Sequence, residues 1–587
     1  MKENKTNVDA LRHSAAHLLA AAVLRLHPKA KLTIGPAIDN GFYYDIDFGA
    51  ESITDTDLSD IEKMMKKTIV EWDKFTSREV TEDEAKEIFA NNPYKLELID
   101  EIVRKGEKIT LYKSGRFEDL CRGGHSQNPV KEIGAFKLLT IAGAYWRGNE
   151  KNAMLTRIYG TAFPTQKELD EYLAMLEEAK KRDHRKLGQE LDLFTFSELV
   201  GKGLPLFTPK GTLLREILNE FSQGLRLKKG FQKVWVPHIT KKELYETSGH
   251  WAKFGNELFL VTSQETTDKM VMKPMNCPHH QQIFASKQRS YRELPIKYLE
   301  TTTIYRDEKA GELLGLSRVR SVTQDDSHTF CTPEQIYDVY QTLIEITKEF
   351  YGALGMKFKA RLSFRNPNTP EKYLGEEELW KKAQDIILEI AQKNDLDYYV
   401  AEGEAAFYGP KIDFMVMDAL GREWQLATPQ LDFVQPQRFG LSYIDSEGKE
   451  QTPVMIHFAL MGSIERFLSV YIEHTAGKFP LWLAPVQVQI LPVSDKFNNS
   501  AADAYKHLHE AGVRVELNDS KNTLGNKIRE ATLQKVPFMC IIGGQEEEKS
   551  KNGDAYIAVR TREGEDLGQL EVKEFIKQIQ KNIETKH

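Results

Sequence analysis

The sequence predicts an α+β protein of several domains, built around a central antiparallel sheet with helices packed on it. Three observations lead to this prediction. The chain has 587 residues, far more than one hydrophobic core usually supports. Its composition, with 41% hydrophobic and 28% charged residues, is that of ordinary globular protein. The hydrophobic pattern also changes along the chain, so we expect a domain at 1–164, a helical linker at 165–190 and further domains at 191–485 and 486–587.

The first segment is expected to mix helices with strands. Residues 11–26 consist largely of strong helix formers, and shorter strand-like and helical runs follow to about residue 159. In the linker, apolar residues recur at helical spacing between 166 and 186, and this stretch ends in basic side chains. Such a basic end either is solvated or contacts RNA, and the sequence leaves both interpretations open.

The two later segments differ in their pattern. The middle segment has no regular alternation of strand, helix and strand, which favours an antiparallel sheet. The last segment does alternate, with strand patterns at 486–492, 513–517, 538–543 and 556–561 and helix patterns at 501–511, 524–534 and 572–583. We therefore predict a small C-terminal α/β domain with a mostly parallel sheet.

The bulk properties argue against several classes of protein. No stretch is long and apolar enough to cross a bilayer, and the first residues lack the apolar core of a secretory signal. The four cysteines are scattered and suggest no disulfide framework. We therefore expect a cytoplasmic protein that does not act on a membrane. The net charge of −7 offers no global attraction to nucleic acid, so an RNA site would have to be a local basic feature.

One strand pattern carries an unusual row of polar residues. Between 317 and 328, alternation along a β-strand puts the following side chains on one face: Arg318, Arg320, Gln324, Asp326 and His328. A solvent-facing strand is the alternative, but such a row of donors, acceptors and metal ligands favours a ligand-binding sheet. Cys277, His328 and His457 are residue types with zinc affinity, although spacing alone leaves ordinary packing the more common explanation for them.

Three motifs around this strand resemble those of a known family. Segment 303–318, a strand pattern followed by a charged loop with glycines, resembles motif 2 of the class II aminoacyl-tRNA synthetases. Segment 456–467 resembles motif 3, and segment 230–237, Gly-Phe-Gln-Lys-Val-Trp-Val-Pro, resembles motif 1 with its proline. The resemblance implies a class II catalytic domain with an antiparallel sheet, and motif 1 implies a homodimer.

The resemblance assigns roles to polar residues of this domain. In-line attack of a carboxylate on the α-phosphate of ATP builds negative charge that a guanidinium can offset. By resemblance, Arg306 bridges the amino-acid carboxylate and the α-phosphate, and Arg466 meets the γ-phosphate. Glu308, Arg318 and Gln425 are expected to bind the rest of ATP, and the polyphosphate implies Mg²⁺.

Within this class, the chain is similar to the threonyl-tRNA synthetases from about residue 10 to 580. The similarity rests on Met-Asn-Cys-Pro at 275–278, Thr-Gln-Asp-Asp-Ser-His at 323–328 and Pro-Val-Met-Ile-His at 453–457. It implies ATP-dependent ligation of L-threonine to tRNA(Thr), with Cys277, His328 and His457 holding one Zn²⁺. Three protein ligands leave a position open, where the amine and hydroxyl of threonine would chelate the metal. Valine lacks the hydroxyl and should be rejected.

The same resemblance implies further residues of the threonine site. Asp326 would accept the hydroxyl proton of threonine, and the pocket would be completed by Gln324, Tyr408, Lys411, Gln430 and Ser463. His250, in Ser-Gly-His-Trp, matches the family's histidine near the terminal ribose and is the candidate base for the tRNA hydroxyl. A stacking or structural histidine is the alternative.

The first segment carries a second constellation of residues. His13 and His17 lie one helical turn apart, and Cys121 and His125 form a second short pair. Spacing alone predicts zinc here, since two histidines, a cysteine and a third histidine are a common ligand set. The resemblance instead implies a metal-free editing domain that hydrolyses mischarged seryl-tRNA(Thr) by positioning water. Alanyl-type domains with the same signature bind zinc, so the question stays open.

An editing domain has a physical reason to exist. Serine also has both chelating groups and lacks only a methyl, a difference worth about 1–3 kcal/mol in a pocket. Tyr44, Lys95 and Asp119 are expected to stack on the terminal adenosine and to hold the ester. A core role for Tyr44 is nearly as good an explanation.

The last segment is similar to the anticodon-binding domain shared by several class II enzymes, where splayed bases meet aromatic, guanidinium and carboxylate groups. Glu546 and Arg560 match the base-reading positions, while Arg529 and Arg562 are either phosphate contacts or surface charges. Two departures from the family stand out. We expect no N-terminal ubiquitin-like module, which many bacterial members have. His279, followed by another histidine, replaces a usual glycine and either perturbs the zinc shell or faces outward.

Three other functions remain as alternatives. The chain could be a synthetase for serine, proline or alanine, an activation-dead tRNA-binding paralogue, or a free-acting deacylase that uses its middle domain as a tRNA clamp. The presence of Arg306, Arg466 and all three metal-binding residue types speaks against the activation-dead paralogue.

Overall fold

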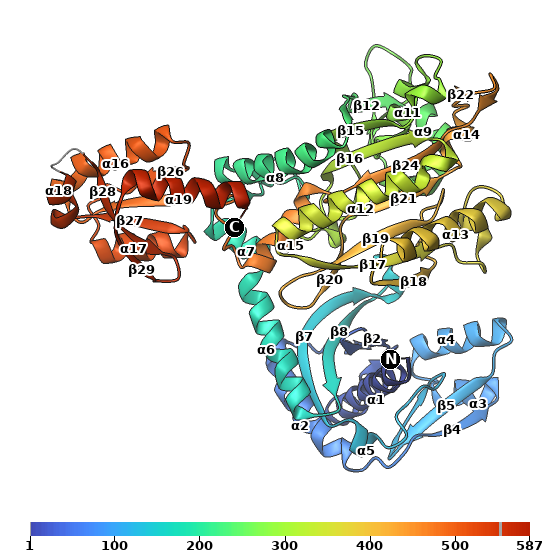
Figure 1. Cartoon of the computed structure of the whole chain (residues 1–587). Coiled ribbons are helices and arrows are strands. Elements are labelled where there is room, and N and C mark those ends of the chain that lie inside the picture. Colours follow the sequence, from blue (N-terminus) through green and yellow to red (C-terminus); the bar gives the residue numbers. More distant parts are fainter. Residues whose placement is uncertain (1, 551–553, 587) are drawn as a thin grey trace. The chain divides into compact units, whose positions relative to one another are not determined.

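The computed structural model describes residues 2–550 and 554–586. The chain divides into two compact units, Met1–Glu178 and Ala179–His587. Figure 1 shows that each unit combines helices with sheets, as predicted for an α+β protein. No described helix combines the length and the apolar character that a membrane span requires.

In the first unit, a long helix packs on a five-stranded antiparallel sheet. The order of this sheet is β1-β3-β8-β7, with β2 paired to β3, and a separate sheet has the order β4-β5-β6. The strands are β1 (Lys31–Leu32), β2 (Ala37–Ile38), β3 (Gly41–Asp47), β4 (Thr76–Val80), β5 (Ile109–Ser114), β6 (Phe117–Leu120), β7 (Ala135–Tyr145) and β8 (Met154–Phe163). The helices are α1 (Lys2–Leu26), α2 (Leu58–Ile69), α3 (Glu82–Ile88), α4 (Pro93–Arg104) and α5 (Pro129–Glu132).

Helix α1 packs closely because of its small residues. Ala15, Ala16, Ala20 and Ala22 are fully buried, and they share a hydrophobic cluster with Phe42 of β3. Close packing of this kind favours one orientation of the helix on the sheet. The helix ends at the predicted residue but begins earlier than the predicted residue 11.

The range predicted as a helical linker contains two helices, α6 (Gln166–Arg182) and α7 (His184–Glu190). The break falls at Asp183, whose backbone is not helical and whose side chain accepts a hydrogen bond from the backbone N–H of Arg185 at 2.8 Å. Aspartate is a favoured residue at a helix N-cap because it satisfies a free N–H group there. A local capping signal therefore starts α7.

The second unit is built on a nine-stranded sheet of order β11-β15-β16-β24-β21-β19-β17-β18, with β20 paired to β19. All pairings are antiparallel except β11 with β15 and β17 with β18, so the predicted antiparallel sheet is confirmed. The strands are β11 (Gln232–Lys233), β15 (Ile296–Tyr305), β16 (Ser321–Cys331), β17 (Lys357–Phe364), β18 (Tyr398–Glu402), β19 (Lys411–Met417), β20 (Glu423–Gln425), β21 (Thr428–Asp432) and β24 (Val454–Ala459).

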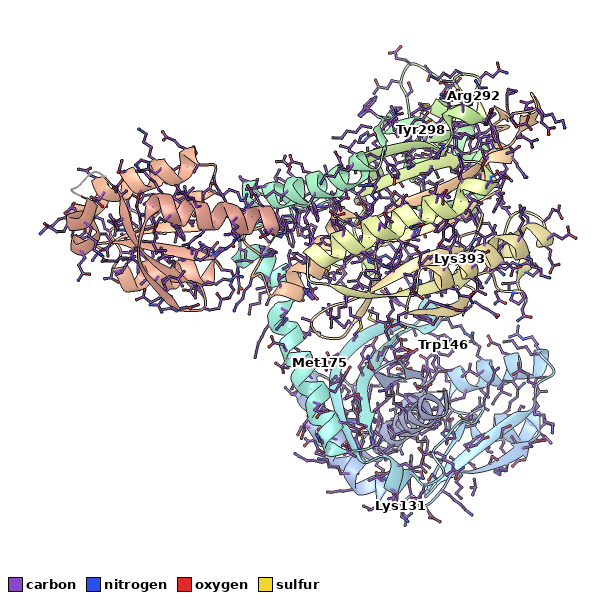
Figure 2. All side chains as sticks on the ribbon, in the orientation of Figure 1. Lys131, Trp146, Met175, Arg292, Tyr298 and Lys393 are labelled. Atoms are coloured by element: carbon purple, nitrogen blue, oxygen red, sulfur yellow. The ribbon has the colours of Figure 1, made fainter. Side chains whose placement is uncertain are left out.

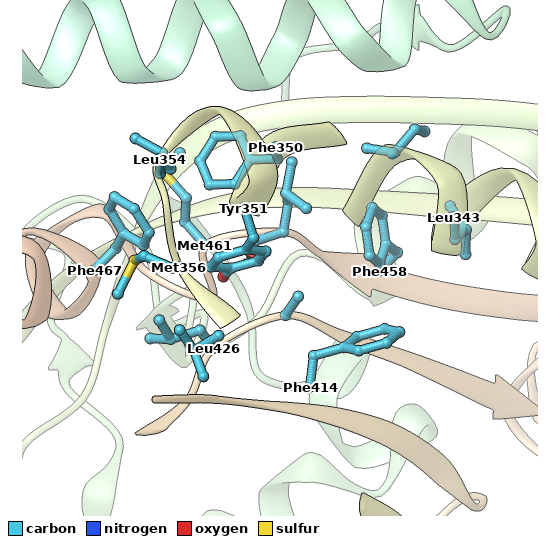
Figure 3. Close-up of a cluster of buried hydrophobic side chains, with 14 of the residues drawn as sticks. Leu343, Phe350, Tyr351, Leu354, Met356, Phe414, Leu426, Phe458, Met461 and Phe467 are labelled. Atoms are coloured by element: carbon cyan, nitrogen blue, oxygen red, sulfur yellow. Dashed lines mark hydrogen bonds between the residues drawn. The ribbon is translucent and has the colours of Figure 1, made fainter. Parts of the chain in front are cut away.

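Long helices bury one side of this sheet, and short elements surround the rest. The long helices are α8 (Pro209–Lys228), α12 (Ile336–Ala353), α13 (Glu377–Lys393) and α15 (Ile464–Thr475). The short elements are β9 (Phe194–Thr195), β10 (Leu206–Phe207), β12 (Ile239–Lys241), α9 (Glu243–Ser248), α10 (His250–Phe254), β13 (Leu260–Val261), β14 (Met270–Met272), α11 (Cys277–Ala285), α14 (Gln435–Arg438), β22 (Tyr443–Ile444) and β23 (Glu450–Gln451). Figure 3 shows part of the core, where Phe350 and Tyr351 of α12 approach Phe467 of α15.

Strand β16 carries polar side chains on both faces. Asp325 points toward α8, where Arg226 and Ser222 contact its carboxylate at 3.4 and 2.9 Å. The backbone N–H of Met461 also donates to Asp325. Asp326 points to the opposite side, because successive residues of a strand alternate between faces. The strand thus supplies an internal ion pair on one face and leaves its even-numbered side chains for the other.

The C-terminal part of the second unit forms a five-stranded sheet of order β26-β25-β27-β28-β29. Only the pairings of β25 with β26 and with β27 are parallel, so the sheet is mixed and the prediction of a mostly parallel sheet is wrong. Strand β29 and helix α18 were not predicted. The elements are β25 (Val488–Pro492), α16 (Asn498–Glu510), β26 (Val515–Leu517), α17 (Leu524–Leu533), β27 (Phe538–Ile542), α18 (Gly544–Ser550), β28 (Tyr556–Thr561), β29 (Asp566–Glu571) and α19 (Val572–Thr585).

The buried ion pair generates a stability prediction. Replacing Arg226 with methionine should lower the free energy of unfolding by about 3–5 kcal/mol, because the Asp325 carboxylate would stay buried without its counter-charge. Denaturant unfolding followed by tryptophan fluorescence measures this. The control is Lys229→Met, which removes an exposed pair with Glu345 near the end of the same helix. It should cost at most about 1 kcal/mol. Equal effects of the two variants would contradict the argument.

Candidate functional site

The three predicted zinc ligands meet on one face of the central sheet. Cys277 begins α11, and His328 of β16 lies directly opposite His457 of β24. All three are buried, and their ligand atoms lie within 4.8 Å of one another. Nε2 of His328 is 3.1 Å from Nδ1 of His457. The fold therefore gathers one sulfur and two nitrogen donors from distant parts of the sequence.

The other ring nitrogen of each histidine also has a partner. Nε2 of His457 is 2.9 Å from the carboxylate of Asp432, and Nδ1 of His328 is 2.8 Å from Nδ1 of His280. The ring of His280 lies 3.6 Å from Glu300. Metal-bound histidines usually have such outer partners, which hold the ring in position. The donor set and its supports fit a zinc ion with three protein ligands.

Predicted residues of the threonine pocket lie on the same strand face. Asp326 accepts a hydrogen bond from the Asn276 side chain at 3.1 Å and lies 3.8 Å from Nε2 of His328. Burial raises the pKa of Asp326. The side-chain oxygen of Gln324 is buried and has no hydrogen-bond partner among the described residues. Both groups are thus placed to meet a polar ligand.

Tyr408 and Gln430 lie on the other side of the cluster. The ring of Tyr408 stacks on His457 with 4.7 Å between centroids, and its hydroxyl donates to Gln430 at 2.5 Å. Gln430 is paired with His457 across β21 and β24. The structure therefore brings both predicted residues to His457, one of the predicted zinc ligands.

Lys411 and Gln425 meet at a buried carboxylate that sequence reasoning missed. Asp413 accepts hydrogen bonds from Lys411 at 2.5 Å, from Gln425 at 2.9 Å and from Arg361 at 2.8 Å. Burial lowers the pKa of Lys411, and Asp413 acts against this. Lys411, predicted for threonine, and Gln425, predicted for ATP, thus belong to one connected group.

His250 lies against the predicted zinc ligand Cys277 and is buried. Its Nε2 is 3.7 Å from the sulfur of Cys277, and its Nδ1 is 2.7 Å from the hydroxyl of Ser248. The ring stacks on Phe254. Burial lowers the pKa of His250 to about 3, so its imidazole is neutral at pH 7. Both predicted interpretations, base and stacking residue, fit this placement.

The two histidines that follow Pro278 are both buried. His280 supports His328, and its ring lies edge-on to Tyr298, which Figure 2 labels. His279 is 8% exposed, so it does not face outward. Burial lowers the pKa of His279 to about 4, and neither of its ring nitrogens has a hydrogen-bond partner in the described part of the chain.

The motif arginines differ in their pairing. Arg306 lies over the ring of Phe254 at 5.0 Å and donates to the sulfur of Met275, and its Nε has no hydrogen-bond partner within the described ranges. Burial lowers its pKa. A desolvated guanidinium with unused donors is suited to an incoming anion. Ser463, predicted for threonine, caps α15 by accepting a hydrogen bond from the backbone N–H of Arg466.

The loop between β15 and β16 holds the remaining predicted ATP residues. Arg318 pairs with Glu308 at 2.7 Å and with Glu312 at 2.5 Å. Arg318 and Arg320 precede β16, so the predicted polar row on that strand is shorter than expected. Partial burial and the charge of Arg318 lower the pKa of Arg466. These two guanidinium groups therefore face a common region, as binding of a polyphosphate would require.

The first unit contains a cavity of about 650 Å³. It is lined by the predicted residues His13, His17, Tyr44, Lys95, Asp119 and Cys121. His125 lies beside it, with 4.5 Å between its ring centroid and that of His13. The ligand atoms of the three histidines and of Cys121 lie within 4.8 Å of one another. The second predicted constellation is therefore assembled at a pocket.

An ion pair forms one wall of this pocket. The ammonium of Lys95 is 2.6 Å from the carboxylate of Asp119, and both side chains are 2% exposed. Tyr44 donates to the same carboxylate at 2.6 Å. Its ring belongs to the hydrophobic cluster under α1, and the alternative interpretation as a core residue fits this burial.

The histidines of this pocket are neutral at pH 7. Burial lowers the pKa values of His13 and His17, and it lowers that of His125 to about 2. His125 stacks on Phe75, and neither of its ring nitrogens has a hydrogen-bond partner among the residues described. Burial also raises the pKa of Cys121, whose sulfur lies 3.5 Å from His13. Cys121 is therefore a protonated thiol rather than a thiolate.

In the C-terminal part, Glu546 is engaged within its own domain. Its carboxylate accepts from the N–H of Gly543 at 3.0 Å and from Gln569 at 2.5 Å. Arg560, in β28, has a buried Nε without a partner in the described residues. Arg562 donates to the backbone carbonyl of Phe479 at 2.8 Å, so it is not merely a surface charge. Arg529 is exposed.

Several supporting residues were missed by sequence reasoning. Asp432 follows Gln430 by two positions, so strand alternation could have placed both on one face. The repeated histidine after Pro278 was a visible signal for His280. Glu300 and Arg361 carry no local signal, because their partners are distant in the sequence: His280 of α11 contacts Glu300, and Asp413 of the neighbouring strand β19 contacts Arg361.

Comparison with protein-family models gives three matches. Residues 259–475 match the class II core domain of the tRNA synthetases for G, H, P, S and T. Residues 487–582 match an anticodon binding domain, and residues 109–159 match the second additional domain of threonyl and alanyl tRNA synthetases. The fold and the site thus define a class II aminoacyl-tRNA synthetase.

Individual relatives narrow the class. A threonine–tRNA ligase of Cytophaga hutchinsonii is 47% identical over 97% of this chain and 88% of its own length. One from Gloeobacter violaceus is 49% identical over 98% of this chain and 92% of its own length. The chain belongs to the threonine–tRNA ligase family.

Solved structures agree with this assignment. The RNA binding domain of a threonyl-tRNA synthetase from Cryptosporidium parvum is 36% identical, with a TM-score of 0.64, over 68% of this chain and 98% of that one. A prolyl-tRNA synthetase of the same organism, crystallised with halofuginone and AMPPNP, is 18% identical with a TM-score of 0.55 over 69% of this chain and 77% of that one. It shares the fold.

The raised pKa of Cys121 predicts its reactivity. At pH 7, alkylation of Cys121 by iodoacetamide should be slower than that of a free thiol such as glutathione, because the thiolate is the reacting form. The rate should keep rising above pH 9. Peptide mapping by mass spectrometry separates Cys121 from the three buried cysteines. A rate that levels off below pH 7 would show a thiolate and contradict the assignment.

Proposed function

We propose that this chain activates L-threonine with ATP and transfers it to tRNA(Thr). The observation that carries the proposal is the buried cluster of Cys277, His328 and His457 beside Asp326, within a chain of the threonine–tRNA ligase family. Enzymes of this class use ATP with Mg²⁺. A metal cluster beside a carboxylate suits an amino acid with an amine and a hydroxyl, which serine shares and valine lacks.

In the first step, a carboxylate oxygen of threonine attacks the α-phosphorus of ATP, the bond to the β-phosphate breaks and pyrophosphate leaves. Arg306 would bridge the carboxylate and the α-phosphate, since its guanidinium is desolvated and its Nε has no hydrogen-bond partner among the described residues. Arg466 would bind the γ-phosphate. The remaining ATP contacts would come from Glu308, Arg318 and Gln425.

Cys277, His328 and His457 would hold Zn²⁺, and the outer partners Asp432 and His280 would keep the rings oriented. When bound, the metal supplies an electrophilic site for the amine and hydroxyl of threonine. Asp326 would accept the hydroxyl proton, and a valine side chain would leave this buried carboxylate unpaired. The pocket would be completed by Gln324, Tyr408, Lys411, Gln430 and Ser463.

In the second step, a terminal ribose hydroxyl of the tRNA attacks the carbonyl carbon of threonyl-adenylate and AMP leaves. His250 would accept the hydroxyl proton. Its neutral imidazole can do so, and the contact of Nδ1 with Ser248 orients the ring.

We propose that the pocket of the first unit hydrolyses seryl-tRNA(Thr) without a metal. His17 and His125 have ring nitrogens without hydrogen-bond partners in the described chain, unlike the supported histidines of the catalytic cluster. Histidines that bind zinc usually have such supports. The neutral imidazoles of His13, His17 and His125 would position a water molecule, whose oxygen attacks the carbonyl carbon of the ester. The ester C–O bond then breaks, a proton from the water passes to the departing ribose oxygen, and serine and the tRNA leave. The protonated thiol of Cys121 argues against a covalent route.

The pocket of the first unit would also bind the ester in a defined orientation. The ion pair of Lys95 and Asp119 is buried and hydrogen-bonded to Tyr44, so it would hold the seryl ester in one orientation. In the C-terminal part, Arg560 would read an anticodon base, since its Nε has no hydrogen-bond partner among the described residues. For Glu546, both carboxylate contacts lie within the domain, and base reading would require one of them to open.

The remaining proposals concern organisation. We propose domains at 1–164, 191–485 and 486–587 with a linker at 165–190, in a cytoplasmic protein that forms a homodimer through motif 1. Trp235 in this motif is 75% exposed, and Ile239 and Leu260 on the small sheet β12-β14-β13 are also exposed. Exposed large apolar side chains of this kind favour an interface.

The two proposed activities should fail independently. Arg306→Ala should lower threonine-dependent ATP–pyrophosphate exchange by at least about 100-fold, because it removes charge stabilisation in the transition state. It should leave deacylation of seryl-tRNA(Thr) intact. His13→Ala should do the reverse. Exchange with serine, proline and alanine tests the other synthetases, and strong serine activation without threonine activation would contradict the proposal.

Metal analysis tests the assignment of the two histidine clusters. The purified chain should hold about one zinc ion, lost on Cys277→Ser. Asp432→Asn should weaken zinc binding by about 10–100-fold, because His457 loses its carboxylate partner. Cys121→Ser is the matched control and should leave the zinc content unchanged. Two zinc ions, one of them lost in the control, would show that the editing pocket binds metal.

A further inference from the structure

His184 connects three elements of the second unit. It lies at the start of α7, is 3% exposed, and contacts both α15 and the loop between β15 and β16. Its Nδ1 is 2.7 Å from the carboxylate of Glu473, and its Nε2 accepts a hydrogen bond from the backbone N–H of Leu316 at 3.1 Å. An imidazole nitrogen that accepts from an N–H carries no proton. The proton of His184 is therefore on Nδ1, and it is donated to Glu473.

The imidazole of His184 packs tightly against the loop between β15 and β16. Gly315 has φ of +49°, and a Cβ atom at this position would lie 2.3 Å from Nε2 of His184. Leu316 is fully buried, which fixes the loop at this point. Arg318 follows two residues later and forms its ion pair with Glu308. The imidazole of His184 thus fixes the position of the backbone that carries Arg318, a proposed ATP-binding residue.

Glu473 extends the connection to the other motif arginine. Its second carboxylate oxygen accepts from Arg422 at 2.5 Å. The guanidinium groups of Arg422 and Arg466 both lie over the ring of Trp424, at 5.3 and 6.0 Å. The carboxylate of Glu473, near the end of α15, therefore contacts His184 through one oxygen and Arg422 through the other. Arg422 in turn shares the ring of Trp424 with Arg466.

We propose that His184 is a positioning residue for the ATP site. It holds the loop that carries Arg318 in a fixed position relative to α15, the helix that carries Arg466. This inference rests on the proposed ATP-dependent activation of threonine, and it adds to that function a residue outside the three sequence motifs. His184 does not touch the nucleotide. It acts through the hydrogen bond to Leu316, and Glu473 keeps the imidazole in the tautomer that can accept this bond.

The test is the Michaelis constant for ATP in threonine-dependent pyrophosphate exchange. His184→Ala should raise KM for ATP by about tenfold, the value of one lost buried hydrogen bond, with KM for threonine changed less than twofold. His184→Gln can place an amide oxygen near the position of Nε2 and should restore part of the effect. His184→Asn can replace only the bond to Glu473 and should not. A matched control is His474→Ala, which alters the residue next to Glu473 on the same helix.

The outcomes separate this inference from the function on which it rests. Wild-type chain without threonine-dependent exchange would overturn the proposed function. Normal wild-type exchange, with KM for ATP unchanged in His184→Ala, would overturn only the role of His184. If the alanine variant does not fold, the glutamine and asparagine variants decide. Rescue by asparagine rather than glutamine, or equal rises in KM for ATP and threonine, would assign His184 a merely structural role.

Discussion

The catalytic site depends on the antiparallel register of β16 against β24. This register places His328 opposite His457, and alternation along β16 turns Asp326 to the same side. Asp325 is turned the other way and is held by Arg226 and by the N–H of Met461. A slip by one residue would exchange the two faces of the strand and bury the wrong carboxylate in each place. The internal ion pair and the metal cluster are therefore maintained by the same register.

The two histidine clusters look alike in composition but differ in their surroundings. In the catalytic cluster, His457 and His328 are held from behind by Asp432 and His280. In the pocket of the first unit, His125 is held by stacking on Phe75, without a hydrogen-bond partner in the described residues. Hydrogen-bonded imidazoles present a fixed lone pair to a metal, whereas stacked neutral imidazoles suit proton transfer with water. The outer contacts, more than the inner residue types, distinguish the clusters.

The charged residues around the proposed ATP site are also divided into two kinds. Arg318 is neutralised by Glu308 and Glu312, while Arg306 is desolvated and lies on Phe254. Partial burial of a guanidinium whose Nε has no hydrogen-bond partner among the described residues is costly, and binding of the proposed carboxylate and phosphate would offset this cost. Around it, a rigid frame of buried carboxylates, including Asp413 and Glu473, fixes the neighbouring basic side chains.

The sequence by itself determined the residue types of both clusters, the polar face of β16 and the antiparallel character of the central sheet, because these depend on local periodicity and on motifs. It did not predict α18 or β29, since the first is acidic and the second lacks alternating apolar residues. Only the tertiary structure decided that Asp432, His280 and Glu300 lie behind the proposed zinc ligands, and that His184 contacts the loop of Arg318. Such contacts join strands and helices distant in sequence, so packing and strand register create them, and no local pattern records them.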